Sequence, residues 1–581
     1  MKREQIIWTI ILLFSAFSFA NAQSNYYLKI EGNAHPLKKK LFIDPSTPVR
    51  DSLTAAVLLE ELVQNWRNEG FLTASLDSSF IKKDTIYAYL SVGEKYRWVK
   101  LGKGNVDESF LRQVGFKEKL YLNRSFSISE YKKLQYRLIT LSENRGNPFA
   151  SIKLDSIKIE GSGIIASLKY SPGPFISYDT LTIVGTAKIK PGFVARYFNI
   201  KKGNPFNRSK ITEAENSVSE FPSVKLVRPT DIIYSNYKAY PVFFLNHRPA
   251  NVIDGIIGFL PNENKNQKLL VTGQLNLNLF NIGGSGKDLL IEWNKLKPLS
   301  QLLNLQFNNY NLLRTGLDLE TKFNLTKEDT TFINIVGRIN ISKPLRGNYG
   351  RIKFFSELKN SRIGSNVVEN QLADSVLADF NLVSYGLGYQ WQNLDDVIFP
   401  RKGLKFTVDG LIGNKTIRRN PTVDSTFNGN ISGKSLQSSL TASIQSHLRI
   451  KGKSGLYAAF SGGFIFNDRI LINDMFRIGG LKTLRGFNEN FFFASGYGIS
   501  NLEFRYFYEA ESFFMLFYDQ AFLRSEFINM INVDYPLGIG AGLNLKTDVG
   551  TLQVVYSLGK SNSQPLNFNY SKIHFGIINR F

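Results

Sequence analysis

The chain of 581 residues contains no cysteine, few histidines and no long apolar run after its first 20 residues. Without cysteine it forms no disulfide, has no thiol chemistry and carries no lipid on an N-terminal cysteine. Transmembrane helices need runs of about 18 or more apolar residues, so the sequence excludes a helical membrane bundle. The four histidines, His35, His247, His447 and His574, are scattered, with no partner at metal-ligand spacing.

Motifs for catalysis and nucleotide binding are missing as well. No G-x-S-x-G nucleophile elbow occurs. Gly161-Ser162-Gly163 is followed by a strand-like segment, whereas a dinucleotide site needs a helix there. Gly286-Lys287 has no glycine at position 281, so it forms no phosphate loop. We therefore expect no catalytic residue, no metal and no cofactor, and we predict that the chain is not an enzyme.

The N-terminus carries the features of an export signal. Lys2 and Arg3 precede an apolar run from Ile6 to Ala20, and Ala20-Asn21-Ala22 has the small residues of a cleavage site. These features predict a secretory signal peptide cut after Ala22. The run of roughly 15 apolar residues is shorter than the roughly 20 that span a bilayer, which argues against a retained anchor.

Beyond residue 250, apolar and polar side chains alternate in segment after segment. In Leu317–Leu325 the odd positions are Leu, Leu, Thr, Phe and Leu, and the even positions are Asp, Glu, Lys and Asn. Successive side chains of a strand point to opposite faces, so each segment has one apolar and one polar face. Segments of about ten residues with an apolar outer face are typical of transmembrane β-barrels. Roughly 330 residues at roughly 20 per strand predict an antiparallel barrel of about sixteen strands.

Residues 23–247 follow a different pattern, and it repeats. Apolar residues at helical spacing predict helices over Asp51–Asn68 and Ser129–Asn144, with Asp51 and Ser129 as N-caps. Both helices end in an N-x-G-x-x-x-A-S signature, whose glycine suits the left-handed conformation after a helix. Two alternating strands follow each time. A third copy opens near Ile176 and lacks the signature.

Tandem β-α-α-β-β modules of about 75 residues, placed behind a signal peptide and ahead of a barrel, resemble POTRA domains. The whole chain resembles the BamA/TamA superfamily of outer-membrane assembly proteins, and its three modules are most similar to TamA-like members. The predicted division is a signal peptide at 1–22, POTRA-like domains at 23–95, 96–173 and 174–247, and an outer-membrane β-barrel at 248–581.

The most specific motif is Phe476-Arg477-Ile478-Gly479-Gly480 followed by Leu484-Arg485-Gly486-Phe487. It resembles the superfamily's lumen-loop signature, F-x-x-G-G then [VL]-R-G-[FY]. In that family the loop folds back inside the barrel, and its arginine pairs with the aspartate of an F-x-D-x-G strand. The matching strand here is Phe517-Tyr518-Asp519-Gln520-Ala521, with alanine in place of the last glycine.

Strand parity supports this pairing independently, because Asp519 faces the lumen if Phe514, Leu516 and Tyr518 face lipid. A guanidinium and a carboxylate in a confined lumen form a bidentate, charge-assisted pair. The predicted lumen-loop site comprises Gly479, Gly480, Leu484, Arg485, Gly486 and Phe487, with Asp519 as the salt-bridge partner.

The last strand resembles the β-signal by which outer-membrane proteins are recognised. Its apolar positions are Ile573, Phe575, Ile577 and the terminal Phe581, with Asn579 interrupting the apolar face. Two glycine-containing turns, residues 281–286 and 399–403, also resemble turns of such barrels.

The resemblance implies a factor that inserts other proteins into the outer membrane or translocates them across it, without nucleotide. Client strands would add to sheet edges of the modules and enter at the seam between residues 253–259 and 573–581. The alternatives are a two-partner-secretion-type exporter and a structural or passive-pore protein. Expected partners are outer-membrane lipid and lipopolysaccharide, nascent outer-membrane or secreted clients, and an inner-membrane or periplasmic accessory protein.

The net charge of +23, from 71 basic and 48 acidic residues, bears on partners too. A basic surface attracts anionic headgroups or acidic polypeptide, although a merely solvated surface explains it equally well. An exported barrel does not meet nucleic acid, so we expect none.

Overall fold

The computed structural model describes residues 26–32, 47–218, 220–260, 270–295, 299–345, 350–364, 377–418, 433–509, 511–527, 530–548 and 550–581. The predicted signal peptide, residues 1–22, lies outside this part of the chain. Described residues up to 176, with 205–208, form one compact unit, and residues 177–204 with 209–581 form a second. None of the described helices is both long enough and apolar enough to cross a membrane.

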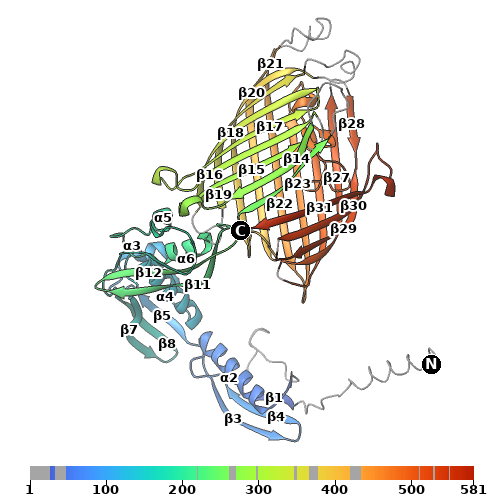
Figure 1. The fold of residues 1–581 in the computed structure, drawn as a ribbon. Helices are drawn as coiled ribbons and strands as arrows, with labels where there is room; N and C mark the ends of the chain where they lie inside the picture. The colour runs from blue at the N-terminus through green and yellow to red at the C-terminus, as the bar shows by residue number, and fades with distance from the viewer. Residues whose placement is uncertain are drawn as a thin grey trace, which may run out of the picture. The chain divides into compact units, whose positions relative to one another are not determined.

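The first unit holds two small α+β modules, each with a four-stranded sheet (Figure 1). The first sheet has the order β2-β1-β4-β3 and the second the order β6-β5-β8-β7. The elements of the first module are β1 (Tyr26–Gly32), β2 (Thr47–Val49), α2 (Ser52–Asn68), β3 (Ser75–Lys82) and β4 (Thr85–Ser91). Those of the second are β5 (Arg97–Gly102), α3 (Glu108–Gln113), η2 (Glu118–Tyr121), β6 (Arg124–Ser125), α4 (Ile128–Glu143), β7 (Ser151–Glu160) and β8 (Gly163–Ser171).

Local sequence signals explain where the two long helices begin. Asp51 caps α2 by accepting the Thr54 N–H at 2.7 Å, as the sequence predicts. The predicted cap of α4, Ser129, is wrong: the helix begins at Ile128 and its cap is Ser127, whose Oγ accepts the Glu130 N–H at 3.3 Å. Two serines lie at this start, and the capping geometry selects the earlier one because its backbone is extended.

A third module opens the second unit. Its elements are β9 (Ser177–Tyr178), β10 (Thr182–Val184), α5 (Pro191–Tyr197), α6 (Arg208–Val218), β11 (Val224–Ser235) and β12 (Lys238–His247). Strand β12 lies between β11 and β10 and also pairs with β9. The third copy therefore has the same sheet-and-two-helix construction that the repeat predicts, with its entering strand split in two.

The predicted barrel is confirmed: an antiparallel sheet closes on itself (Figure 1). In the described residues β28 and β29 both pair with β27, so they are two parts of one strand and the barrel has sixteen strands. The strands are β13 (Val252–Leu260), β14 (Leu270–Leu279), β15 (Lys287–Lys295), β16 (Gln301–Asn309), β17 (Asp318–Glu328), β18 (Phe332–Leu345), β19 (Gly350–Ile363), β20 (Asp379–Leu394), β21 (Gly403–Arg418), β22 (Gly433–Arg449), β23 (Ser454–Phe466), β26 (Gly496–Phe507), β27 (Phe513–Phe527), β28 (Met530–Asp534), β29 (Leu537–Lys546), β30 (Thr551–Lys560) and β31 (Lys572–Arg580).

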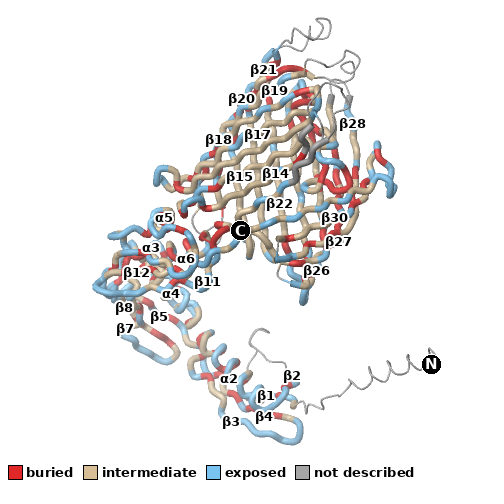
Figure 2. The backbone as a smooth tube through the Cα atoms, viewed as in Figure 1, coloured by how far each residue is buried: buried red, intermediate tan, exposed pale blue. Residues whose placement is uncertain are grey.

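The barrel wall turns its apolar side chains outward. Leu502 and Phe504 of β26 are exposed, whereas Glu503 between them is buried. Figure 2 shows the wall mainly at intermediate burial, while the modules have buried segments at their centres. The apolar face, which would form the core of a soluble sheet, therefore lies on the outside of the barrel, and the polar face lines the lumen.

Two turns of the barrel share one construction at the end where the third module lies, which we call the module end. In the first turn the N–H of Asn281 donates to Asp288, and the side-chain oxygen of Asn281 accepts the N–H of Gly286. The second turn repeats both bonds at the same spacing from Asn311. Both asparagines have positive φ, which this residue tolerates better than most. The spacing N-x-x-x-x-G-x-D is the sequence signal of this turn.

The third module contacts both turns. The N–H of Lys190 donates to the Gly284 carbonyl oxygen at 2.9 Å. The Tyr197 hydroxyl on α5 donates to Asp318 Oδ2 at 3.0 Å, and the Arg351 guanidinium of β19 binds the same carboxylate. A further ion pair joins Arg248 to Asp396 at 2.6 Å, next to the predicted turn at 399–403. The third module is therefore held to the module end of the barrel by polar contacts.

Candidate functional site

Residues 467–495, between β23 and β26, form a long loop that we call the lumen loop. It contains a short hairpin, β24 (Phe476–Ile478) paired with β25 (Phe492–Ala494). The loop contacts Glu503 and Asp519. Each of these side chains points into the barrel, because it lies between outward-facing residues of its strand. The loop therefore lies inside the barrel.

The structure places the Arg485 guanidinium directly on Asp519. Arg485 Nε donates to Asp519 Oδ2 at 2.7 Å, and Nη2 donates to Oδ1 at 2.6 Å, so the pair is bidentate. The Arg485 backbone N–H donates to the same carboxylate at 3.1 Å. Arg485 is 5% exposed and Asp519 is fully buried, so this ion pair is shielded from bulk water. A bidentate pair fixes both the position and the orientation of the Arg485 side chain on Asp519.

Further groups complete the arginine's surroundings. Arg485 Nη1 donates to Glu503 Oε1 at 2.7 Å, and the guanidinium lies 3.7 Å from the ring centroid of Phe517. The Asn501 amide links the Asp519 carboxylate to the loop backbone, donating to Asp519 Oδ1 at 2.8 Å and to the Thr483 carbonyl oxygen at 3.0 Å. Two carboxylates thus face Arg485, and a second arginine, Arg505, pairs with Glu503 at 2.6 Å.

Glycines let the loop backbone approach the barrel wall closely. Gly486 has φ of 92°, and a Cβ there would lie 2.7 Å from the Gly559 nitrogen of β30. A Cβ on Gly559 would in turn lie 2.6 Å from the Gly486 carbonyl oxygen. Gly479 and Gly480 also have positive φ, at 127° and 95°. The motif's glycines are therefore required by backbone conformation and by close approach.

The apolar members of the motif pack on the inner wall. Leu484 and Phe487 are fully buried, in a cluster with Ile478, Ala494, Ile499, Ala521 and Leu523. Ala521, which stands where the superfamily strand has glycine, contributes its methyl group to this cluster. Ion pair, glycines and apolar cluster together hold this part of the loop against β26, β27 and β30.

The apolar side chains of the C-terminal strand point outward. Ile573, Phe575 and Ile577 of β31 and the terminal Phe581 are all exposed. Within the described residues β31 pairs with β13 at Val252↔Arg580 and Ile253↔Asn579. By contrast, β13 pairs with β14 along its whole length, and β31 pairs with β30 from Lys572 to Ile578. The seam that closes the barrel is therefore short.

Sequence reasoning missed Glu503, Asn501 and Phe517. The first two lie on a strand whose alternation, Asn501-Leu502-Glu503-Phe504-Arg505, could have marked them as inward residues. Phe517 belongs to the predicted strand motif, but nothing in the sequence indicates that its ring stacks on the arginine. No group of acidic or histidine residues in the described part of the chain could hold a metal ion.

The site holds a loop in place. A closed sixteen-stranded barrel with an arginine-anchored lumen loop, preceded by small α+β modules, defines the class: an outer-membrane barrel of the POTRA-bearing type. The Omp85 superfamily domain matches residues 281–581. The chain belongs to the Omp85 superfamily, and this barrel places it in the outer membrane.

The chain was compared with solved structures, and two of the matches are these. CdiB from Escherichia coli has a TM-score of 0.53 at 12% identity, over 90% of this chain and 97% of that one. BamA from Haemophilus ducreyi lacking POTRA domains 1-3 has a TM-score of 0.41 at 12% identity, over 84% and 99%. No curated protein matches the chain by sequence. At these identities the likeness to CdiB supports the fold alone.

Proposed function

We propose that this protein inserts other proteins into the outer membrane or translocates them across it, through the seam between β13 and β31 and without nucleotide or catalytic chemistry. The observation that carries the proposal is the short seam. Two register pairs, Val252↔Arg580 and Ile253↔Asn579, close a sheet whose other strands pair over most of their lengths.

The seam leaves strand edges unpaired, and a client strand could pair with these edges. The rest of β13 beyond Ile253, and β31 from Lys572 to Ile578, have no partner across the seam in the described register. Unpaired backbone groups in lipid cost several kcal/mol each, so these edges favour pairing with an incoming client strand. A client that pairs there would satisfy its own backbone as it enters the membrane.

The modules supply edges as well, because β3 and β7 each lie at the end of their sheet. On the first module Phe80 of β3 stacks on Tyr87 at 5.4 Å, and Phe80 and Tyr89 are exposed. An extended client strand could add to such an edge by β-augmentation and rest its side chains on these rings. In this proposal the modules lie in the periplasm after removal of the signal peptide.

A polypeptide exporter of the two-partner-secretion type is the second candidate, because transporters of that type resemble this chain in barrel and lumen loop. An exporter passes its substrate through the lumen. In this chain the lumen loop, held by Arg485 and Asp519, occupies that space and would first have to leave it. The lateral route at the seam leaves the loop in place, and for this reason we prefer the insertion function. A passive pore is the third candidate function.

Depletion of the protein, followed by quantification of the outer-membrane and secreted proteomes, tests the proposal. We expect loss of many barrel proteins from the outer membrane. Loss of one secreted protein with the barrels unchanged would instead establish the dedicated exporter. An unchanged proteome would contradict both and favour the passive pore. Lipopolysaccharide and an inner-membrane or periplasmic accessory protein are the further proposed partners, and crosslinking in intact envelopes would identify them.

A further inference from the structure

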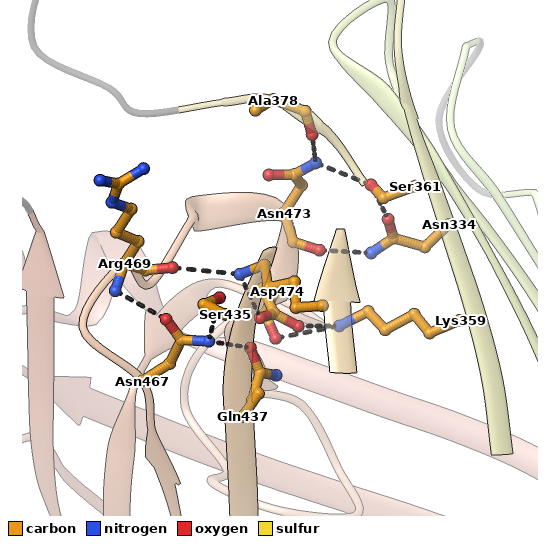
Figure 3. A network of polar contacts seen from close by, with 11 residues as sticks. Asn334, Lys359, Ser361, Ala378, Ser435, Gln437, Asn467, Arg469, Asn473 and Asp474 are labelled. Carbon is orange, nitrogen blue, oxygen red and sulfur yellow. Dashed lines mark hydrogen bonds and ion pairs between the residues drawn. The ribbon is translucent and has the colours of Figure 1, made fainter. Parts of the chain in front are cut away.

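A second polar network holds the start of the lumen loop to the barrel wall (Figure 3). The short helix η5 (Ile472–Asp474) presents Asp474 to two lysines of the wall. Asp474 Oδ1 lies 2.6 Å from Lys359 Nζ of β19, and Oδ2 lies 2.8 Å from Lys415 Nζ of β21. The side chains of Asp474 and Lys415 are 1% and 0% exposed.

The backbone and the neighbouring side chain are held in the same place. Asn473 Nδ2 donates to Ser361 Oγ at 2.7 Å and to the Ala378 carbonyl oxygen at 2.8 Å. The Asn334 amide donates to the Asn473 carbonyl oxygen at 2.7 Å. These partners come from β18, from β19 and from the residue before β20. The contacts fix the loop by its backbone as well as by its charge.

Apolar packing completes this anchor. Leu471 is fully buried in a cluster with Ala378, Phe380, Leu382 and Ile417. The Lys415 ammonium also lies 4.8 Å from the ring centroid of Phe380 and donates to the Arg469 carbonyl oxygen at 3.1 Å. The start of the loop is therefore built into the wall with ion pair, hydrogen bonds and apolar contact together.

The two anchors have opposite polarity and lie on different strands. At Arg485 the loop supplies the cation and β26 and β27 supply the carboxylates. At Asp474 the loop supplies the carboxylate and β19 and β21 supply the cations. Between them Lys482 reaches Glu292 of β15 at 2.6 Å. The segment from 474 to 485 is therefore held at both of its ends.

We propose that Asp474 is a positioning residue that pins the start of the lumen loop to β19 and β21, independently of Arg485, so that the loop is a strap fixed at both ends across the lumen. Release of one anchor then frees only the adjacent part of the strap. This inference goes beyond the proposed function and does not depend on which client the protein serves.

Site-specific labelling tests the inference, because the chain contains no cysteine of its own. Leu471→Cys reports on the Asp474 anchor and Leu484→Cys on the Arg485 anchor, since both leucines are fully buried. Full-length protein in liposomes of defined phospholipid is treated with a membrane-impermeant maleimide. Folding of each variant is first established by its faster migration in unheated detergent gels.

We expect Asp474→Asn to raise labelling of Leu471→Cys at least tenfold and to leave Leu484→Cys protected. Arg485→Ala should give the reverse pattern, and Asp474→Glu should restore part of the protection at position 471. General loosening of the barrel would expose both reporters together, and that result would overturn the proposal. Unchanged protection of Leu471→Cys in folded Asp474→Asn would overturn it as well.

Asp474→Asn leaves the buried Lys415 and the partly buried Lys359 without a counter-charge and can prevent folding. Asn473→Ala is the second variant, because it removes two hydrogen bonds of the same anchor and leaves no charge unpaired. We expect it to fold and to raise labelling of Leu471→Cys severalfold, with Leu484→Cys unchanged. If position 471 stays as protected as in the parent, the anchor assignment is wrong.

Discussion

The Arg485–Asp519 pair can be tested by a double-mutant cycle, with Arg485→Ala, Asp519→Ala and the double variant. Arg485→Ala removes three charge-assisted side-chain hydrogen bonds, two to Asp519 and one to Glu503. It leaves Asp519 buried with the Asn501 amide and the position-485 backbone N–H as its remaining donors. The aspartate keeps part of its stabilisation, but its countercharge is gone.

The expected cost follows from this geometry. Three bonds to charged groups would contribute about 1.5–3 kcal/mol each if they were independent. The three bonds act as one unit, and Asp519 keeps two donors. We therefore expect either single variant to lower the free energy of unfolding by about 3–5 kcal/mol, the range for breaking a buried pair. The double variant should cost about 0.5–3 kcal/mol less than the sum of the singles. Arg485→Lys should be intermediate, since it keeps the charge and loses the planar fork.

The assay is unfolding by urea in detergent, followed by loss of the heat-sensitive gel mobility of the folded barrel. Arg469→Ala is the matched control, because this arginine is exposed near the start of the same loop. The control should unfold like the parent. Strictly additive losses in the double variant would refute the reasoning, since two side chains that contact each other cannot contribute independently.

Three further outcomes are expected. Gly559→Ala should cost about 1–3 kcal/mol of barrel stability in the same assay, because its Cβ would crowd Gly486. Gly337→Ala is the control and should leave barrel stability unchanged, because a Cβ there would have no atom within 4 Å. Burial raises the pKa of the Glu220 carboxyl in the third module, so its contribution to stability is complete below its unfolded pKa of about 4.3 and is lost as the pH rises through the folded pKa. The parent should therefore lose stability relative to Glu220→Gln as the pH rises above about 4.3, and parallel pH curves would contradict this. N-terminal sequencing of envelope protein should begin at Gln23, and an intact Met1 would refute the signal peptide.

Much of the fold could be predicted from side-chain periodicity alone. The alternation seen in Leu317–Leu325 recurs in segment after segment, and this recurrence predicted the strands, their faces and the barrel together. The glycines after α2 and α4 were equally informative, because Gly70 and Gly146 have the positive φ that the motif requires. The cap of α4 was missed because Ser127 and Ser129 both satisfy the local preference and only the backbone conformation separates them.

The candidate site could be predicted only where a motif covers it. Arg485 and Asp519 could be found because one belongs to a signature and the other has inward parity. Asp474, Lys359 and Lys415 carry no such signal: the aspartate lies in a loop, and its two lysines are distant in sequence. Strand register alone brings β19 and β21 to the same loop, and register is set by the whole sheet.

The central claim, that clients enter at the seam, is tested most directly by locking it. Ile253 and Asn579 are register partners, whose Cα atoms lie about 4.5–5.5 Å apart in such pairs, a separation that suits a disulfide. Ile253→Cys with Asn579→Cys therefore closes the seam reversibly, and Ile339→Cys with Ser356→Cys, partners on β18 and β19, is the control.

The measurement is the rate at which the variant in liposomes folds a urea-denatured barrel client, followed by the client's resistance to protease. The account predicts that the oxidised seam variant loses its acceleration of folding and that reduction restores it, while the control pair accelerates folding in both states. Equal acceleration by the oxidised and reduced seam variants would contradict the account.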